Sequence, residues 1–279
     1  MGPAASGEQD LVAGRVEGAL LLNGVELAWR DRGSGPPILF LHETAASAVI
    51  WEQLTEEIAA GARAVALDRR GWGASAAPDQ YVGTTIEEQA ADADALLREL
   101  GAEAAVLCGA GLGAVVALEL LLRHRELAAA AVLIEPPLLA FLPEATEGIG
   151  ADRQAITDAV AEGGIEAAAD LYLSGGLGHL GAGAERLPES IRAGARERPF
   201  SLFAEIGAVP AWSLRVGELA ALDAPSRIVV GSGTPQLLRA AAEQLEHRLG
   251  ATELVDVGAD GLPHVGAAAR VAGVLGDLT

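Results

Sequence analysis

The stretch that decides the fold reads Ala105-Val106-Leu107-Cys108-Gly109-Ala110-Gly111-Leu112-Gly113-Ala114. It opens with apolar residues typical of a buried strand, continues with glycines at alternate positions, and leads into a helical pattern from Leu112 to His124. The pattern predicts a strand that turns sharply into a helix. Small residues at the turn let the two backbones approach closely, and the N–H groups at the start of the helix face the turn.

Two kinds of site use such a turn. In the nucleophile elbow G-x-S-x-G, the central side chain projects above the sheet. Gly109 and Gly113 match its outer glycines, but the central residue is Gly111, which has no side chain that could attack a substrate. The dinucleotide fingerprint G-x-G-x-x-G/A also fits, because Ala114 stands at its last position and Glu135 ends the next strand. The segment alone leaves both interpretations open.

Strands and helices alternate on both sides of this segment. Asn23-Gly24 predicts a hairpin between strands at 19–22 and 25–30. The pattern then predicts strands at 38–41, 64–67, 104–107, 129–134, 227–230 and 253–257, and helices at 49–60, 86–100, 112–124, 235–249 and about 265–278. A hairpin followed by such alternation predicts an α/β fold with a mostly parallel sheet and helices on both faces.

The alternation stops between the sixth and seventh strands, where helical stretches occur without apolar strands. We therefore predict a helical cap inserted after the sixth strand, covering the carboxyl edge of the sheet. The predicted organisation is a loose N-terminal tail at 1–10, the first part of the core at 11–143, the cap at 144–215 and the second part of the core at 216–279.

Composition narrows the classes of partner. Of the 279 residues, 51% are hydrophobic, enough for a large core, and the formal charge of −20 disfavours nucleic acid and anionic membranes as partners. The single cysteine, Cys108, allows no internal disulfide, and no metal-ligand spacing is present. The first ten residues lack the features of a signal peptide, and the longest apolar run, 127–134, is too short to span a bilayer. We expect a cytoplasmic protein.

Three other segments resemble the α/β-hydrolase superfamily, in its haloalkane-dehalogenase and esterase-like branch. Residues 40–51, FLHETAASAVIW, resemble the loop in which His-Gly is followed by Trp; 68–75, DRRGWGAS, resemble D-x-x-G-x-G-x-S; and His264 in GLPHV lies where the family carries its catalytic histidine. The resemblance covers nearly the whole chain outside the insertion. It implies the α/β-hydrolase fold with eight strands, no cofactor, and a monomer or homodimer. A dinucleotide-binding domain would open with its fingerprint, whereas four strands come first here, so a redox domain is only the remote alternative.

The resemblance also implies roles for individual residues. His264 is the base, and Glu135 stands where dehalogenase relatives carry the acid, although it could instead pair with Arg69 or Arg70. The oxyanion hole would use the backbone N–H groups of Thr44 and Leu112, and Gly111 marks the vacant nucleophile position. The weaker histidine candidates are His42, a scaffold residue of the loop, and His124, His179 and His247.

Glu43 departs from the family, which usually has glycine there. It is either a solvated loop residue or an acid/base group at the mouth of the pocket. A second set of residues is apolar and either lines a substrate pocket or is ordinary core; its members are Trp51, Leu138, Leu139, Phe141, Phe200, Phe203 and Trp212.

The favoured function is that of an enzyme without covalent catalysis. A His264–Glu135 dyad would act as general base beside a backbone oxyanion hole, either activating a water lodged above Gly111 or transferring a proton as lyases and cyclases do. The substrate would be small and mostly apolar. The alternatives are a non-catalytic protein that binds a small ligand, and an engineered inactive variant of a serine hydrolase. A His264–Glu135 contact beneath an open cavity would favour the enzyme.

Overall fold

The computed structural model describes residues 15–214 and 216–279, so the predicted tail at 1–10 lies outside the described residues. The predicted mostly parallel, eight-stranded sheet is confirmed, with the order β1-β2-β4-β3-β5-β6-β7-β8. The strands are β1 (Arg15–Leu22), β2 (Val25–Gly33), β3 (Pro37–Leu41), β4 (Arg63–Leu67), β5 (Ala105–Ala110), β6 (Ala128–Ile134), β7 (Ser226–Val230) and β8 (Thr252–Asp256).

The first two strands form the predicted hairpin. They pair antiparallel with Leu22 opposite Val25, and Asn23 and Gly24 have φ values of 48° and 80°, as a tight primed turn requires. β2 also runs antiparallel to β4, whereas the strands from β4 to β8 are parallel. The carboxyl ends of the parallel strands therefore share one edge of the sheet, and the loops after β3, β5, β6 and β8 meet there.

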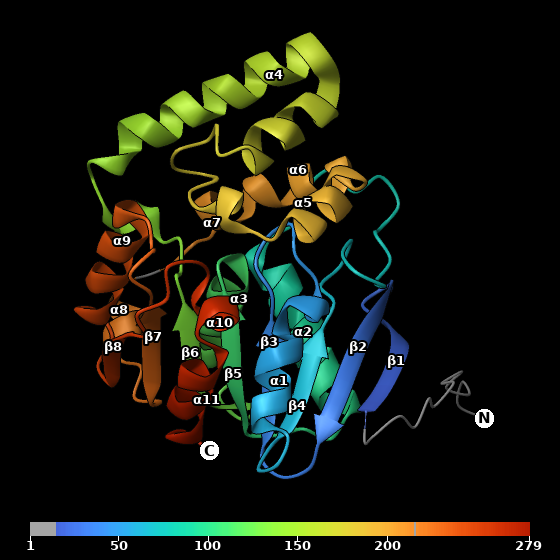
Figure 1. Cartoon of the computed structure of the whole chain (residues 1–279), viewed down its shortest axis with the longest axis vertical. Coiled ribbons are helices and arrows are strands. Elements are labelled where there is room, and N and C mark those ends of the chain that lie inside the picture. Colours follow the sequence, from blue (N-terminus) through green and yellow to red (C-terminus); the bar gives the residue numbers. More distant parts are fainter. Residues whose placement is uncertain (1–14, 215) are drawn as a thin grey trace.

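Helices cover both faces of the sheet because side chains alternate along each strand. In β3, Leu39 and Leu41 belong to one buried cluster and Ile38 and Phe40 to the other. The first cluster lies under α2 (Ile86–Glu99), α3 (Leu112–Arg123) and α9 (Gln236–Glu246). The second lies under α1 (Glu52–Ile58) and α11 (Ala268–Gly276), which run side by side in Figure 1.

Two predicted helices are interrupted. The helix predicted at 49–60 begins as a 3-10 turn, η1 (Ala48–Trp51), before α1. The last predicted helix is divided into α10 (Pro263–Gly266) and α11, because Ala267 leaves helical geometry with φ −140° and ψ 37°. The short α10 carries His264, so the break places the histidine at the sheet edge instead of within a long helix.

The chain between β6 and β7 is helical, as predicted, and lies over the carboxyl ends of the parallel strands (Figure 1). We call residues 139–214 the helical insertion. It contains η2 (Leu139–Phe141), the long α4 (Ala145–Leu173), η3 (Ala184–Arg186), α5 (Glu189–Arg196), α6 (Pro199–Ile206) and α7 (Ala208–Ala211), and α8 (Val216–Ala220) follows before β7. α4 bends at Gly164, whose φ of 78° is left-handed. Within the described ranges, no helix combines the length and apolarity needed to cross a membrane.

Three arginines tie the insertion to the core. Arg69, on the loop after β4, forms a buried ion pair with Glu205 of α6. Arg198 donates from the start of α6 to the carbonyls of Gly71 and Gly73, at 3.1 and 2.7 Å. Arg186 of η3 donates to both oxygens of Glu135, at 2.9 and 2.6 Å. Charged hydrogen bonds of this kind are stronger than neutral ones, so the insertion is held in place over the sheet edge.

Candidate active site

The turn after β5 has the geometry of an elbow. Gly111 has φ 52° and ψ −123°, a conformation that side-chain-bearing residues rarely adopt, and α3 begins directly after it. A Cβ atom on Gly113 would collide with the carbonyl of Leu41, and one on Gly109 with the carbonyl of Gly113. Both outer glycines are therefore required by the close approach of α3 to the neighbouring strand ends.

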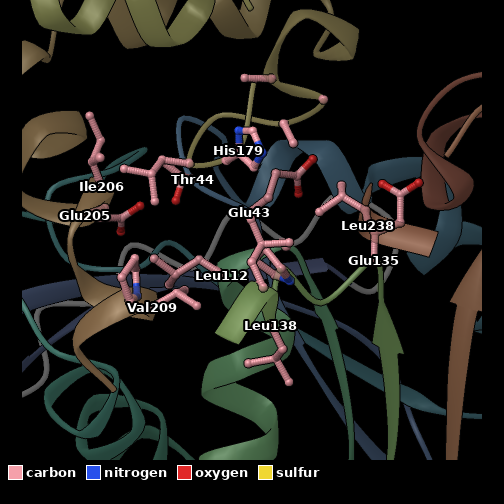
Figure 2. A pocket seen from close by; sticks show the side chains of 18 of the residues that line it. Glu43, Thr44, Leu112, Glu135, Leu138, His179, Glu205, Ile206, Val209 and Leu238 are labelled. Carbon is pink, nitrogen blue, oxygen red and sulfur yellow. The ribbon is translucent and has the colours of Figure 1, made fainter. Parts of the chain in front are cut away.

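Glu43 fills the space above Gly111. A Cβ atom built on Gly111 would lie 2.8 Å from the Cβ of Glu43, closer than real Cβ atoms approach. The expected water above Gly111 is therefore not accommodated next to its Cα, because the Glu43 side chain is already there. Figure 2 shows Glu43 over Leu112, the first residue of α3. The glycine at 111 and the glutamate at 43 are consequently coupled: the first leaves room for the second.

The Glu43 carboxylate faces His264. Its Oε1 lies 3.3 Å from Nε2 of His264, and the two side chains are 12% and 1% exposed. Burial raises the pKa of the Glu43 carboxyl, but electrostatic interactions, led by the charge of the nearby His264, together lower it by more, so that the pKa lies below its ordinary value. Among the described residues, Nδ1 of His264 has no hydrogen-bond partner. The two groups form a buried acid/base pair.

Trp51 supports this pair from the side. Its ring packs on the imidazole of His264, with 4.6 Å between ring centroids, and it is fully buried. Trp51 does not line the cavity, so its prediction as a substrate-binding residue is corrected. Trp51 is the last residue of η1, which follows the loop after β3 that carries Glu43.

Glu135 is not the partner of His264, which corrects the predicted dyad. Its carboxylate accepts two hydrogen bonds from Arg186 and one from the Thr234 hydroxyl at 2.5 Å. The alternative partners Arg69 and Arg70 are engaged elsewhere, with Glu205 and with Asp92. A buried carboxylate needs a cation, and the bidentate guanidinium of Arg186 supplies it. The contacts with Arg186 and Thr234 also occupy the Glu135 carboxylate, which the dinucleotide-binding interpretation would need for the ribose hydroxyls.

A buried network fixes the loop that carries Glu43. The His42 ring donates from Nδ1 to the Glu43 carbonyl at 2.8 Å, and its Nε2 accepts the Arg69 backbone N–H at 3.1 Å. Burial and the charge of Arg69 hold the pKa of His42 well below its ordinary value, so the ring is neutral. Arg69 also donates to the His42 carbonyl at 2.8 Å and pairs with Glu205. His42 is therefore a scaffold residue, as predicted.

The two predicted oxyanion donors border the same space. Thr44 and Leu112 both line the cavity, and within the described ranges neither N–H donates to a loop or side-chain acceptor. Leu112 is the first residue of α3, so its N–H has no acceptor inside the helix. Tyr172 of α4 borders the same cavity as Thr44, and burial raises the pKa of its hydroxyl.

A cavity of about 420 Å³ lies between this site and the helical insertion. Of the predicted lining residues, Leu138, Leu139, Phe141 and Trp212 border it, whereas Phe200 and Phe203 do not; Phe200 is 53% exposed at the surface. Sequence reasoning missed several lining residues, all from the insertion or its borders: Ile149, Arg153, Tyr172, Leu180, Ile206, Val209 and Leu214. The size is that of a small-molecule site.

One group of potential metal ligands occurs among the described residues. Asp94, His124 and Glu126 bring ligand atoms within 4.8 Å of one another. Arg98 already forms ion pairs with Asp94 and Glu126, at 2.9 and 2.7 Å. None of the three borders the cavity, so this group does not belong to the candidate site.

Comparison with known proteins places these features in a family context. Residues 36–199 match the family model described as alpha/beta hydrolase fold. The hydrolase YraK of Bacillus subtilis is 33% identical over 125 residues, which are 45% of this chain and 46% of the relative. A putative non-heme bromoperoxidase, BpoC of Mycobacterium tuberculosis, is 33% identical over 112 residues, 39% of this chain and 42% of the relative. The matched region thus spans less than half of each of these relatives.

Solved structures agree over almost the whole chain. A hydrolase from Pseudomonas aeruginosa superimposes with a TM-score of 0.76 at 22% identity, covering 94% of this chain and 97% of the other. The enol-lactonase of Burkholderia xenovorans gives 0.71 at 20% identity, covering 93% and 98%. At these identities, the likeness is one of fold.

Proposed function

The chain belongs to the alpha/beta hydrolase family, and on that premise we propose that it is a hydrolase-type enzyme in which Glu43 and His264 together handle the proton of the reaction. The observation that carries the proposal is the 3.3 Å contact between Oε1 of Glu43 and Nε2 of His264, directly above Gly111. The substrate is small and mostly apolar, in keeping with the cavity beneath the insertion.

The proposed chemistry uses no nucleophile at position 111. The Glu43–His264 pair takes a proton from a water molecule or from the substrate and later returns it, and the low pKa of Glu43 keeps its carboxylate charged beside the imidazolium that forms. The N–H groups of Thr44 and Leu112 are available for negative charge that develops on a substrate oxygen, since neither donates to a loop or side-chain acceptor in residues 15–214 and 216–279. This arrangement suits hydrolysis by water or transfer of a substrate proton.

The test is turnover of a panel of short-chain chromogenic esters and lactones by the chain and three variants. We expect His264→Ala and Glu43→Gln each to lower kcat by about 100-fold or more, as loss of a general acid/base does. Glu135→Gln is the matched carboxylate control. It should lower the unfolding temperature and have a smaller effect on kcat, because Glu135 pairs with Arg186 and not with His264. If Glu43→Gln retained full turnover while Glu135→Gln lost it, the assignment of the pair would be wrong.

A non-catalytic role has one observation in its favour. No described residue is a hydrogen-bond partner of Nδ1 of His264, and position 111 is a glycine without a nucleophilic side chain, so a non-covalent binding role is a second candidate. If the whole panel remained unchanged by the chain while apolar ligands bound in the cavity, the ligand-binding role would replace the enzymatic one.

A further inference from the structure

The cavity is bordered by charged groups of both signs. At the floor, beside Gly111, both carboxylate oxygens of Glu43 are buried and receive no hydrogen bond from the described residues. The other two acids that border the cavity are neutralised: Glu135 by Arg186 and Glu205 by Arg69. The floor therefore presents the Glu43 carboxylate with His264 as its neighbour at 3.3 Å. A ligand carboxylate placed there would compete with Glu43 for the same imidazole in a region of low dielectric, which is costly.

The cavity is also bordered by an arginine without a partner among the described residues. Arg153 borders the cavity and is also exposed to solvent, so it lies where the cavity meets the surface. Within the part of the chain that the structure describes, its guanidinium makes no ion pair, hydrogen bond or ring contact. This is unusual for a chain with 39 acidic and 19 basic residues, in which carboxylates outnumber cations by two to one.

The helix holds Arg153 on the cavity side. Ile149 and Arg153 are four residues apart on α4 and therefore share one face of the helix, and both border the cavity. The neighbouring acid, Asp152, is turned elsewhere: its Oδ2 accepts the backbone N–H groups of His179 and Leu180, at 2.8 and 2.7 Å. The nearest carboxylate in sequence is thus committed to the insertion's own loop and leaves Arg153 unpaired.

We infer that the substrate is amphipathic, with an anionic group, such as a carboxylate, held by Arg153 at the mouth of the cavity and an apolar body leading to the reacting group at Glu43 and His264. The apolar body would contact Ile149, Leu139 and Leu180, which border the same cavity. Arginine binds carboxylates in a bidentate manner, and its long side chain can follow a ligand at a solvent-exposed mouth. The unpaired guanidinium of Arg153 thereby orients the substrate, because the Glu43 carboxylate at the floor already has His264 as its neighbour. The inference rests on the proposed function for the identity of the reacting end, but the binding end can be tested by itself.

The test is calorimetric titration of the full chain with octanoate, octan-1-ol and octylamine, which share one apolar body and differ in charge. Octanoate should bind more tightly than octylamine. Arg153→Gln should weaken octanoate roughly 10-fold, the effect of one charged hydrogen-bonding pair, and leave octan-1-ol unchanged. Arg153→Glu should reverse the order of octanoate and octylamine. Arg270→Gln, which removes an exposed arginine outside the cavity, is the matched control and should leave all three ligands unaffected.

Three outcomes would overturn the inference: no binding of octanoate, an octanoate affinity equal in the chain and in Arg153→Gln, or a large gain in octanoate affinity in Glu43→Gln, which would place the carboxylate at the floor. Failure of the proposed function has a different signature. If octanoate depended on Arg153 while His264→Ala kept full ester turnover, the anionic binding end would stand and the Glu43–His264 chemistry would fall.

Discussion

Restoring a serine at the elbow should succeed only when Glu43 is removed at the same time. In Gly111→Ser, the new Cβ would lie 2.8 Å from the Cβ of Glu43, about 0.6 Å short of an ordinary contact. Cβ of Glu43 is next to the backbone and cannot swing aside. Overpacking of this kind costs about 1–3 kcal/mol, and the backbone of residue 111, with φ 52° and ψ −123°, adds about 1–3 kcal/mol for any residue with a side chain.

The two contributions can be separated with a matched control. Gly101 has φ +57°, close to the +52° of Gly111, but nothing lies within 4 Å of a Cβ built there. Gly101→Ser therefore reports the cost of a side chain at positive φ without a steric overlap, and the recovery in Glu43→Gly/Gly111→Ser reports the overlap at the backbone angles of residue 111 itself, whose ψ is −123°. We expect Gly111→Ser to unfold at a temperature lower than Gly101→Ser by roughly 2–12 °C, from about 2–4 °C per kcal/mol of overlap in a chain of this size. Glu43→Gly/Gly111→Ser should recover most of that difference.

The assay is thermal denaturation of the four chains and of Glu43→Gly, combined in a double-mutant cycle. In Glu43→Gly/Gly111→Ser, the serine would also face His264 without the intervening carboxylate, so a burst of product from a chromogenic ester should appear. Residues 43 and 111 do not compete for the same space if Gly111→Ser is as stable as Gly101→Ser, or if the cycle gives no coupling between the two positions.

Three other predictions follow from the buried charges and the stacked ring. The pKa of Glu43 is lower in the folded chain than its unfolded value of 4.5, so the charged carboxylate contributes stability above pH 4.5. This contribution is lost as pH falls through the folded pKa. In urea denaturation between pH 6 and 3, the free energy of unfolding should therefore fall less in Glu43→Gln than in the unaltered chain. Arg69→Gln leaves Glu205 buried without its cation and should cost about 3–5 kcal/mol in urea denaturation, and a cost under 1 kcal/mol would contradict the role of this pair. Trp51→Leu removes the ring that packs on His264 and should lower kcat about 10-fold with little change in KM, as displacement of a catalytic group does. Trp51→Phe keeps an aromatic ring and should retain most of kcat. Equal kcat values for the two variants would contradict a positioning role of the ring.

The sheet and its flanking helices could be predicted because their signals are local. Apolar runs bounded by glycine and proline, an Asn-Gly hairpin turn and a 3.6-residue period each report on a few neighbouring residues. The same holds for the elbow at Gly111, where the glycine pattern itself indicates a strand entering a helix. The resulting strand order places the loops after β3, β5, β6 and β8 together, and so brings Glu43, Gly111, Glu135 and His264 to one edge.

Which of these groups pair with one another could not be predicted from the sequence. Glu135 is bound by Arg186, which lies 51 residues away in the helical insertion. Sequence patterns do not predict how the helices of this insertion pack on the sheet. The contact between Glu43 and His264 needs the space that Gly111 leaves by having no side chain. This space depends on how three segments far apart in the sequence pack together. Tyr172 and Arg153 were missed for the same reason: helical periodicity gives the face of a helix but not the surface that it will cover.

The arginine contacts between insertion and core also govern how a ligand enters and leaves. Lifting the insertion as a rigid body would separate Arg69 from Glu205 and Arg186 from Glu135 at once, exposing four charged groups whose partners are built into the opposite layer. Opening in this manner is slow compared with the rotation of exposed side chains. Ligand exchange should therefore pass through the mouth of the cavity beside Arg153. The residence time of a ligand is then set by side-chain rearrangement at this mouth. Ligands too wide for the mouth are excluded, however well they would fill the cavity.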